Sequence, residues 1–261
     1  MLRASSPTLF SISLVALTVL ASASFGCGGD DAGTRAAAPD ASADTGVKVI
    51  GAGDPARVTQ HGVIVDLDSK KGVPGATVSA GDQVVTTGAD GSYAFTVKKG
   101  EAFTMTVTAP DYAKLVEQET VIDADFDRGK TSFVSSGTAS LLLGTLDGYD
   151  ASLGVLSVQL LPSGACASEA GTRVKVSPEG TAKVRYVLHG IPTSRADSAA
   201  ANEFPTAVIY NVEPGVPLSV SVEAGSCTQT AFPLDRDGVR YTGGVTTEAG
   251  SVTSFARIFL Q

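Results

Sequence analysis

The chain has 261 residues, of which 43% are hydrophobic, 18% charged and 6% aromatic, and its formal net charge is −8. This apolar content is too high for a chain that is disordered throughout. The acidic excess argues against a nucleic-acid partner, because phosphate contacts need a basic face. With 2 His and no Trp, we expect neither a His-based metal site nor a cofactor.

Residues 1–26 have the pattern of a signal peptide. The apolar run from Leu9 to Leu20 is shorter than the ~20 residues that cross a membrane and has the length of a signal-peptide core. Small residues follow this run and lead to Gly26 and Cys27. The sequence therefore predicts export of the mature chain.

The Gly26-Cys27 pair at the end of an apolar run resembles a bacterial lipobox, although Ser24 stands where this motif usually has Leu. The resemblance implies cleavage before Cys27, lipidation of its thiol and a membrane partner reached through that anchor. The residue after Cys27 is Gly28 rather than Asp, which by the best-known sorting rule favours the outer membrane over retention at the inner membrane. The alternative is an ordinary secretory signal that leaves Cys27 free.

Residues 27–57 contain many Gly, Ala and Asp residues and few bulky apolar ones, so they predict a disordered tether behind the lipidated cysteine. Beyond Cys27, only Cys166 and Cys227 remain. An even pair in an exported chain predicts a disulfide, with two buried free thiols as the alternative. On the chain-entropy model such a bond stabilises the fold by about 2–4 kcal/mol.

Residues 58–143 predict a first β-sandwich, because apolar and polar residues alternate with turns between them. Short runs of this kind at regular spacing are typical of sandwiches. The expected strands lie at 63–67, 76–80, 84–87, 93–97, 103–107, 113–122 and 131–143.

Part of this segment resembles the carboxypeptidase regulatory-like family, whose fold is a transthyretin-like β-sandwich. The matching residues are Gly62–Asp66, Gly72–Val78, Thr87–Phe95, Val97 and Gly100. The resemblance implies that Asp90 and Gly91 form a hairpin turn and that Tyr93 and Phe95 are core residues. It also implies an accessory role without peptidase activity.

Residues 144–261 contain a diverged repeat of the first sandwich. With a shift of 115 residues, segment 92–107 aligns without a gap on segment 207–222, and Gly100 falls on Gly215. Upstream, 74–78 resembles 170–174, and Gly62-Val63 resembles Gly154-Val155. The repeat predicts a second sandwich, and so an all-β fold of two small sandwiches. The segment 190–205 is an insertion, which we expect to be a long loop.

Motifs for catalysis or metal binding are weak in this sequence. It contains neither an H-x-x-E zinc motif nor a G-x-S-x-G elbow, so His61 and His189 are interpreted as surface or strand-end residues. Asp123, Asp125 and Asp127 alternate, but the residues that follow do not fit a calcium loop. A solvated turn between strands is the better interpretation.

These observations predict a non-enzymatic, lipid-anchored protein of the cell envelope with a binding or scaffolding role. Its expected partners are the membrane and either an envelope protein or a glycan. The alternative function is carbohydrate binding, for which Tyr149 or Tyr241 would have to be exposed as a platform.

Overall fold

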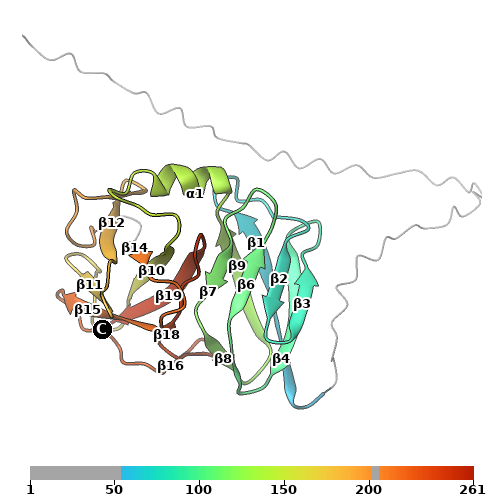
Figure 1. The fold of residues 1–261 in the computed structure, drawn as a ribbon. Coiled ribbons are helices and arrows are strands. Elements are labelled where there is room, and N and C mark those ends of the chain that lie inside the picture. The colour runs from blue at the N-terminus through green and yellow to red at the C-terminus, as the bar shows by residue number, and fades with distance from the viewer. Residues whose placement is uncertain (1–53, 202–205) are drawn as a thin grey trace, which may run out of the picture. The chain divides into compact units, whose positions relative to one another are not determined.

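The computed structural model describes residues 54–201 and 206–261 (Figure 1). The predicted signal peptide, Cys27 and most of the predicted tether lie outside these residues. The described part is built from β-strands and one short helix, which confirms the predicted all-β class. Within this part, no helix is long and apolar enough to cross a membrane.

The elements fall into two successive groups, which we call the first and the second sandwich, with the helix between them. The first contains β1 (Arg57–Asp66), β2 (Thr77–Ala80), β3 (Gln83–Thr86), β4 (Ser92–Lys98), β5 (Ala102–Phe103), β6 (Met105–Thr108), β7 (Leu115–Glu117), β8 (Thr120–Ile122) and β9 (Phe126–Phe133). The helix α1 (Ser136–Leu143) follows. The second contains β10 (Gly154–Pro162), β11 (Arg173–Ser177), β12 (Lys183–Leu188), β13 (Ile191–Thr193), β14 (Thr206–Val212), β15 (Leu218–Ala224), β16 (Leu234–Arg236), β17 (Val239–Tyr241), β18 (Gly244–Val245) and β19 (Val252–Leu260).

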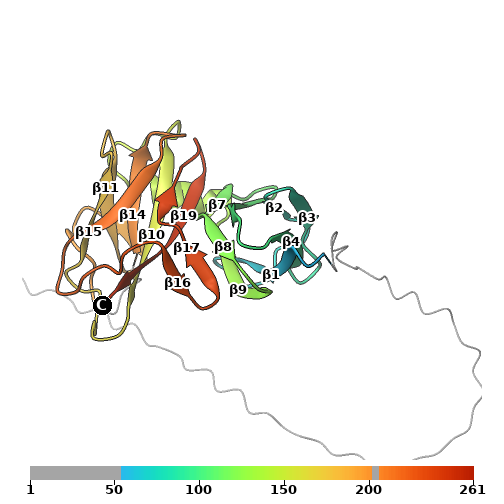
Figure 2. The same ribbon diagram turned by 90° about the horizontal axis from the view of Figure 1, so that it is seen from below.

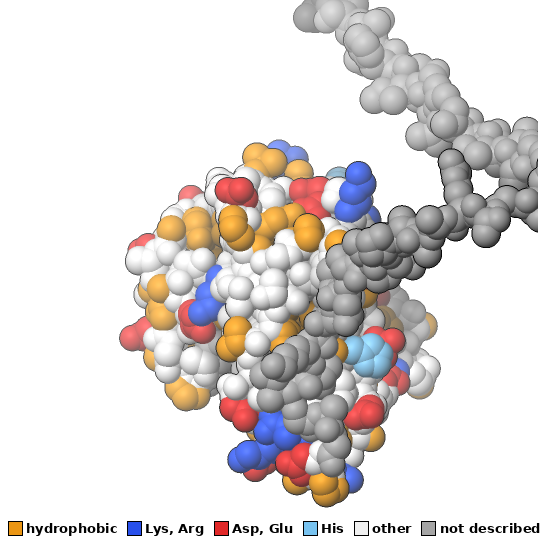
Figure 3. All heavy atoms as spheres, turned by 90° about the vertical axis from the view of Figure 1, so that its right-hand side faces the viewer, with side chains coloured by type: hydrophobic (Ala, Val, Ile, Leu, Met, Phe, Trp, Pro, Cys, Tyr) orange, Lys and Arg blue, Asp and Glu red, His pale blue; other side chains and the backbone are white. Residues whose placement is uncertain are grey.

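The core of the first sandwich lies between the sheet β4-β1-β9 and the strands β3, β2, β6 and β7. Tyr93 and Phe95 are 2% and 1% exposed, and their rings stack with centroids 5.8 Å apart. The predicted inward register of these two aromatic residues is therefore confirmed. Acidic and basic side chains are interspersed on the outer face of this sandwich (Figure 3).

The turn before β4 explains two of the glycines in the family-like motif. Gly91 has a φ of +82°, and a Cβ atom there would lie 2.3 Å from the carbonyl oxygen of Ile64. A Cβ atom on Gly72 would lie 1.8 Å from the carbonyl oxygen of Asp90. The Asp90 carboxylate accepts a hydrogen bond from the backbone N–H of Ser92 at 2.9 Å. A turn is present, with the left-handed conformation at Gly91, but the predicted hairpin is wrong, because β3 pairs with β2 and β4 pairs with β1 in separate sheets.

The second sandwich repeats the pairing of the first. Strand β10 pairs antiparallel with β14 and parallel with β19, as β1 does with β4 and β9. Val78 pairs with Val107, and the residues that the repeat places on them, Val174 and Val222, also pair. The 115-residue shift that places Val107 on Val222 and the separate upstream match that places Val78 on Val174 thus agree with each other.

The upstream match of Gly62-Val63 with Gly154-Val155 is wrong in register. Phe95 pairs with Gln60 in the first sandwich, whereas Tyr210, its equivalent, pairs with Val155. Val155 therefore takes the place of Gln60 rather than of Val63. The reason is that a two-residue Gly-Val match contains no alternation from which a register follows.

Other element predictions also need correction. The expected strand 131–143 ends at Phe133, because the Ser135 hydroxyl accepts a hydrogen bond from the backbone N–H of Thr138 and caps α1. The expected strand 113–122 is divided into β7 and β8. The expected loop 190–205 begins with β13, which forms a hairpin with β12 across His189 and Gly190, both at positive φ. Residues 202–205 of it lie outside the described part.

The two sandwiches are joined through backbone pairing. Strand β19 pairs in parallel with β7, so that one sheet of nine strands runs β13-β12-β14-β10-β19-β7-β6-β2-β3 (Figure 2). Strand β17 also pairs with β8. Three residues of the second half, Val239, Tyr241 and Phe259, lie in the core of the first sandwich. The division of the chain at residue 143 stays a prediction.

Replacing Phe95 with Ala should lower the free energy of unfolding by about 3–5 kcal/mol, because the ring is fully enclosed in the first core. The measurement is urea-induced unfolding of residues 28–261, followed by circular dichroism. Val84→Ala on β3, where the side chain is 68% exposed, is the control and should change stability by less than about 0.5 kcal/mol. A loss below about 1 kcal/mol for Phe95→Ala would contradict the observed packing.

Candidate functional site

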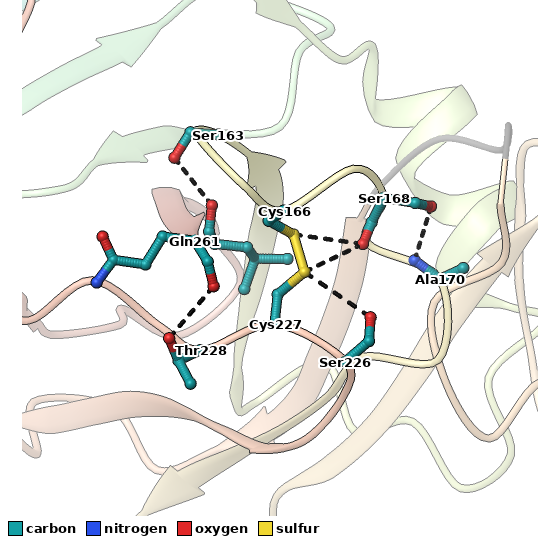
Figure 4. Close-up of a disulfide and its surroundings, with 9 residues drawn as sticks. Ser163, Cys166, Ser168, Ala170, Ser226, Cys227, Thr228 and Gln261 are labelled. Carbon is teal, nitrogen blue, oxygen red and sulfur yellow. Dashed lines mark hydrogen bonds between the residues drawn. A yellow bond between two sulfur atoms is a disulfide. The ribbon is translucent and has the colours of Figure 1, made fainter.

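The predicted pairing of Cys166 with Cys227 is present in the structure (Figure 4). The sulfur atoms lie 2.08 Å apart and the Cα atoms 5.6 Å apart, with 61 residues of sequence separation. Cys166 follows β10 and Cys227 follows β15, where both strands leave the second core. Cys27, the predicted lipidation site, lies outside the described residues.

The disulfide joins the two segments that hold the end of β19. On one side, the backbone N–H of Ser163 donates to the carbonyl oxygen of Leu260 at 2.8 Å. On the other, Thr228 and Gln261 exchange two backbone hydrogen bonds of 2.9 Å. The bond between Cys166 and Cys227 therefore fixes the segments on both sides of the C-terminal strand (Figure 4).

A third layer covers part of the second sandwich. Leu146, which follows α1, packs with Val155, Val208 and Tyr210 on the outer face of β10 and β14, away from the second core. Leu143 and Tyr149 add partly buried contacts to this cluster. The segment from α1 to Tyr149 thus lies over a sheet face that would otherwise be exposed (Figure 1).

Between α1 and the sheet is a cavity of about 370 Å³, which we call the α1 cleft. Its floor comes from neighbouring strands of the long sheet and its wall from the helix and the β12–β13 hairpin. None of its lining side chains is charged or titratable. The lining residues are Leu67, Leu115, Ser132, Val134, Leu142, Leu143, Val155, Ser157, Val187, Gly190, Pro192, Thr206, Val208 and Val252.

Exposed apolar side chains occur beside the α1 cleft. Leu141 on the helix is 72% exposed and Ile191 on β13 is 47% exposed. Each is adjacent in sequence to residues that line the cleft. The helix α1 also contacts β13. Single exposed leucines are common, but a pair next to an apolar cavity is typical of a binding site. The arrangement can bind an apolar group, and its lining holds no titratable side chain that could activate the hydroxyls of Ser132, Ser157 and Thr206.

A buried ion pair lies at the junction of the two sandwiches. The Glu117 carboxylate on β7 and the Arg128 guanidinium on β9 are 2.5 Å apart, with side chains 6% and 10% exposed. Burial alone would lower the pKa of Arg128, but the Glu117 carboxylate, Tyr93 and Tyr241 together outweigh it, and the pKa is raised. Burial raises the pKa of the nearby Tyr93 to about 12, so this phenol is neutral at physiological pH.

The tyrosines considered as a glycan platform are not open. Tyr241 is 2% exposed and packs against Phe259 in the first core, so it does not meet the requirement of the alternative function. Its hydroxyl accepts a hydrogen bond from Arg257 at 3.1 Å. Tyr149 is half-buried in the third layer. The sequence left the exposure of Tyr241 open, because its strand β17 pairs with β8 of the first sandwich, which is distant in sequence.

The other candidate residues lie at the surface. The imidazole of His61 on β1 is 53% exposed and lies 3.6 Å from the Asp127 carboxylate. Asp123 and Asp125 lie between β8 and β9, as the predicted solvated turn requires, while Asp127 belongs to β9. The described residues contain no group of three or more His, Cys, Asp or Glu side chains that could hold a metal ion.

The α1 cleft was missed by the sequence analysis, because its lining residues come from elements that are distant in sequence. The run Leu141–Leu143 contained the available signal. Three successive leucines break the alternation of a half-buried strand and fit a helix that covers an apolar surface.

No model of a protein family and no curated protein sequence matches the chain. The resemblance to the carboxypeptidase regulatory-like family therefore stays a prediction. Similar solved structures include the Bacillus anthracis TIE protein, at 8% identity and a TM-score of 0.25, covering 78% of this chain and 34% of that one. A streptococcal ancillary pilin has 8% identity and a TM-score of 0.25, with coverage of 80% and 63%.

The minor pilin GBS52 of Streptococcus agalactiae is 14% identical, with a TM-score of 0.23 and coverage of 78% of this chain and 95% of that one. The chain spans about a third of the TIE protein and less than two thirds of the ancillary pilin. TM-scores this low assign neither a fold nor a function.

Replacing both Cys166 and Cys227 with Ser should lower the free energy of unfolding by about 2–4 kcal/mol, because the bond closes a long loop. Amide hydrogen exchange at Leu260 and Gln261 should also become faster, since the segments that hold them are released. Ser226→Ala, next to Cys227 and exposed, is the matched control. Unchanged stability and exchange in the double variant would contradict this role of the disulfide.

Replacing Glu117 with Leu should destabilise the protein by about 3–5 kcal/mol, because Arg128 is left as an uncompensated buried charge. Adding Arg128→Met should recover much of this loss. Glu101→Ala breaks the exposed pair with Lys98 and should change stability by less than about 1 kcal/mol. The explanation is wrong if the double variant is less stable than Glu117→Leu alone.

Proposed function

We propose that this chain is a non-enzymatic, lipid-anchored protein of the cell envelope, in which Cys27 is the acylated N-terminus and the paired sandwiches have a scaffolding or binding role. The supporting observation is the disulfide between Cys166 and Cys227, since such bonds persist in exported proteins and are rare in reducing compartments. The apolar run before Gly26 and Cys27 supplies the route of export.

An acylated Cys27 would attach the protein to a membrane through its lipid chains, since each buried CH₂ adds about 0.8 kcal/mol. Residues 28–57 would then separate the folded body from the bilayer by about 30 Å as a coil. Cleavage before Cys27 would remove Arg3 and no acidic residue, so the net charge of the full chain, −8, would become −9, which disfavours contact with an anionic surface. We propose the outer membrane as the location, with an envelope protein or glycan as further partner.

The test is metabolic labelling with a palmitate analogue in cells that express the full chain. Label should be present in the wild type and absent in Cys27→Ser, which should also move from the membrane fraction to the soluble fraction. The matched control is the double variant Cys166→Ser, Cys227→Ser, which should keep its label. Equal labelling of Cys27→Ser and wild type would overturn the proposal.

A further inference from the structure

We propose that the α1 cleft is a binding site for a single linear hydrocarbon chain, the acyl tail of an amphiphile whose polar head stays at the rim. This inference goes beyond the proposed function and does not depend on lipidation of Cys27. It rests on the lining of the cleft, the pairing of its floor and the length of that floor.

The lining selects for an apolar ligand. Its only side-chain polar groups are the hydroxyls of Ser132, Ser157 and Thr206, in a set that otherwise consists of aliphatic side chains, Pro and Gly. A sugar or a charged group would lose its hydration in this cavity and find few hydrogen-bond partners in return. A hydrocarbon chain loses no hydrogen bonds there and gains from the burial of apolar surface.

The floor also disfavours a peptide. Strand β10 pairs with β14 on one side and with β19 on the other, so its backbone groups are engaged within the sheet. A peptide that adds to a sheet needs an open strand edge, whereas the cleft presents a sheet face. The contacts available on this face are therefore the side chains of Val155 and Ser157 and of their neighbours on the adjacent strands.

The length of the floor fits one acyl tail. The lining residues Leu115, Val252, Val155, Val208 and Val187 belong to β7, β19, β10, β14 and β12, which are consecutive in the sheet. At a strand spacing of about 4.8 Å, this row spans about 19 Å. One leaflet of a bilayer, half of the ~30 Å hydrocarbon core, sets a similar length for a single tail.

The helix is suited to admit such a chain. Among its eight residues, Ala139 alone is buried. Leu142 and Leu143 line the cleft and are half-buried, while Leu141 is exposed to solvent. A ligand would therefore cover apolar surface that the fold leaves partly open to water, which is the gain that drives binding.

The test uses the secreted form, residues 28–261, titrated with cis-parinaric acid below its micellar concentration. Saturable binding of one probe per chain is expected. Competition by saturated fatty acids should strengthen about fourfold per added CH₂ until the chain fills the cleft. If palmitate competes better than vesicles of dioleoyl phosphatidylglycerol, the bound tail comes from a free fatty acid. If the vesicles compete better, it comes from a bilayer lipid. Either result supports the proposal.

Variants locate the site. Ser157→Leu fills the floor and Leu142→Gln places an amide in the wall, and each should weaken binding at least about fivefold. Val84→Gln is the matched control, at an exposed apolar residue of β3 outside the lining, and should stay within about twofold of wild type. Thermal unfolding checks that each variant is folded. If Ser157→Leu does not fold, the binding measured for Leu142→Gln decides the outcome. Absence of saturable binding, or an equal loss of binding in Val84→Gln, overturns the proposal.

Discussion

The parallel pairing of β7 with β19 is the constraint on which the rest of the structure depends. Val252, Thr253 and Ser254 lie opposite Leu115, Val116 and Glu117, which joins the strands of both sandwiches into one sheet. The pairing also brings β17 beside β8 and places Tyr241 in the first core. Without it, the second half would withdraw three buried side chains from the first.

Both candidate features of the surface follow from this continuous sheet. The α1 cleft has a floor only because β7 and β19 are adjacent, so that side chains from both sandwiches lie on one face. The disulfide acts at the other end of β19, where it holds the segments on each side of Leu260. Strand β19 thus connects the stabilised C-terminal end of the second sandwich to the junction with the first.

Local pattern predicted the parts of the fold in which neighbours in sequence are neighbours in space. Alternation located most strands, the family-like motif located the turn at Asp90 and Gly91 and the core position of Tyr93 and Phe95, and cysteine counting paired Cys166 with Cys227. The ungapped repeat of 92–107 in 207–222 matched Val107 to Val222, and the upstream repeat of 74–78 in 170–174 matched Val78 to Val174, in agreement with the observed pairing.

The remaining features depend on pairing between distant segments. Strands β7, β8 and β17 have only three residues each, too few to show a periodicity, and nothing local indicates that they meet. Because β17 is too short to show a periodicity, the sequence did not indicate that the Tyr241 side chain is buried in the first core. The α1 cleft also depends on distant segments, since its lining residues come from both halves of the chain.

The most direct test of this account is hydrogen exchange of residues 28–261 across a denaturant series, read separately at β4 in the first core and at β14 in the second. If β7 and β19 join the halves into one cooperative body, amides of both strands should lose protection at the same denaturant concentration, and Tyr241→Ala should lower that concentration for both. Two separate transitions, with only one of them moved by Tyr241→Ala, would contradict the account.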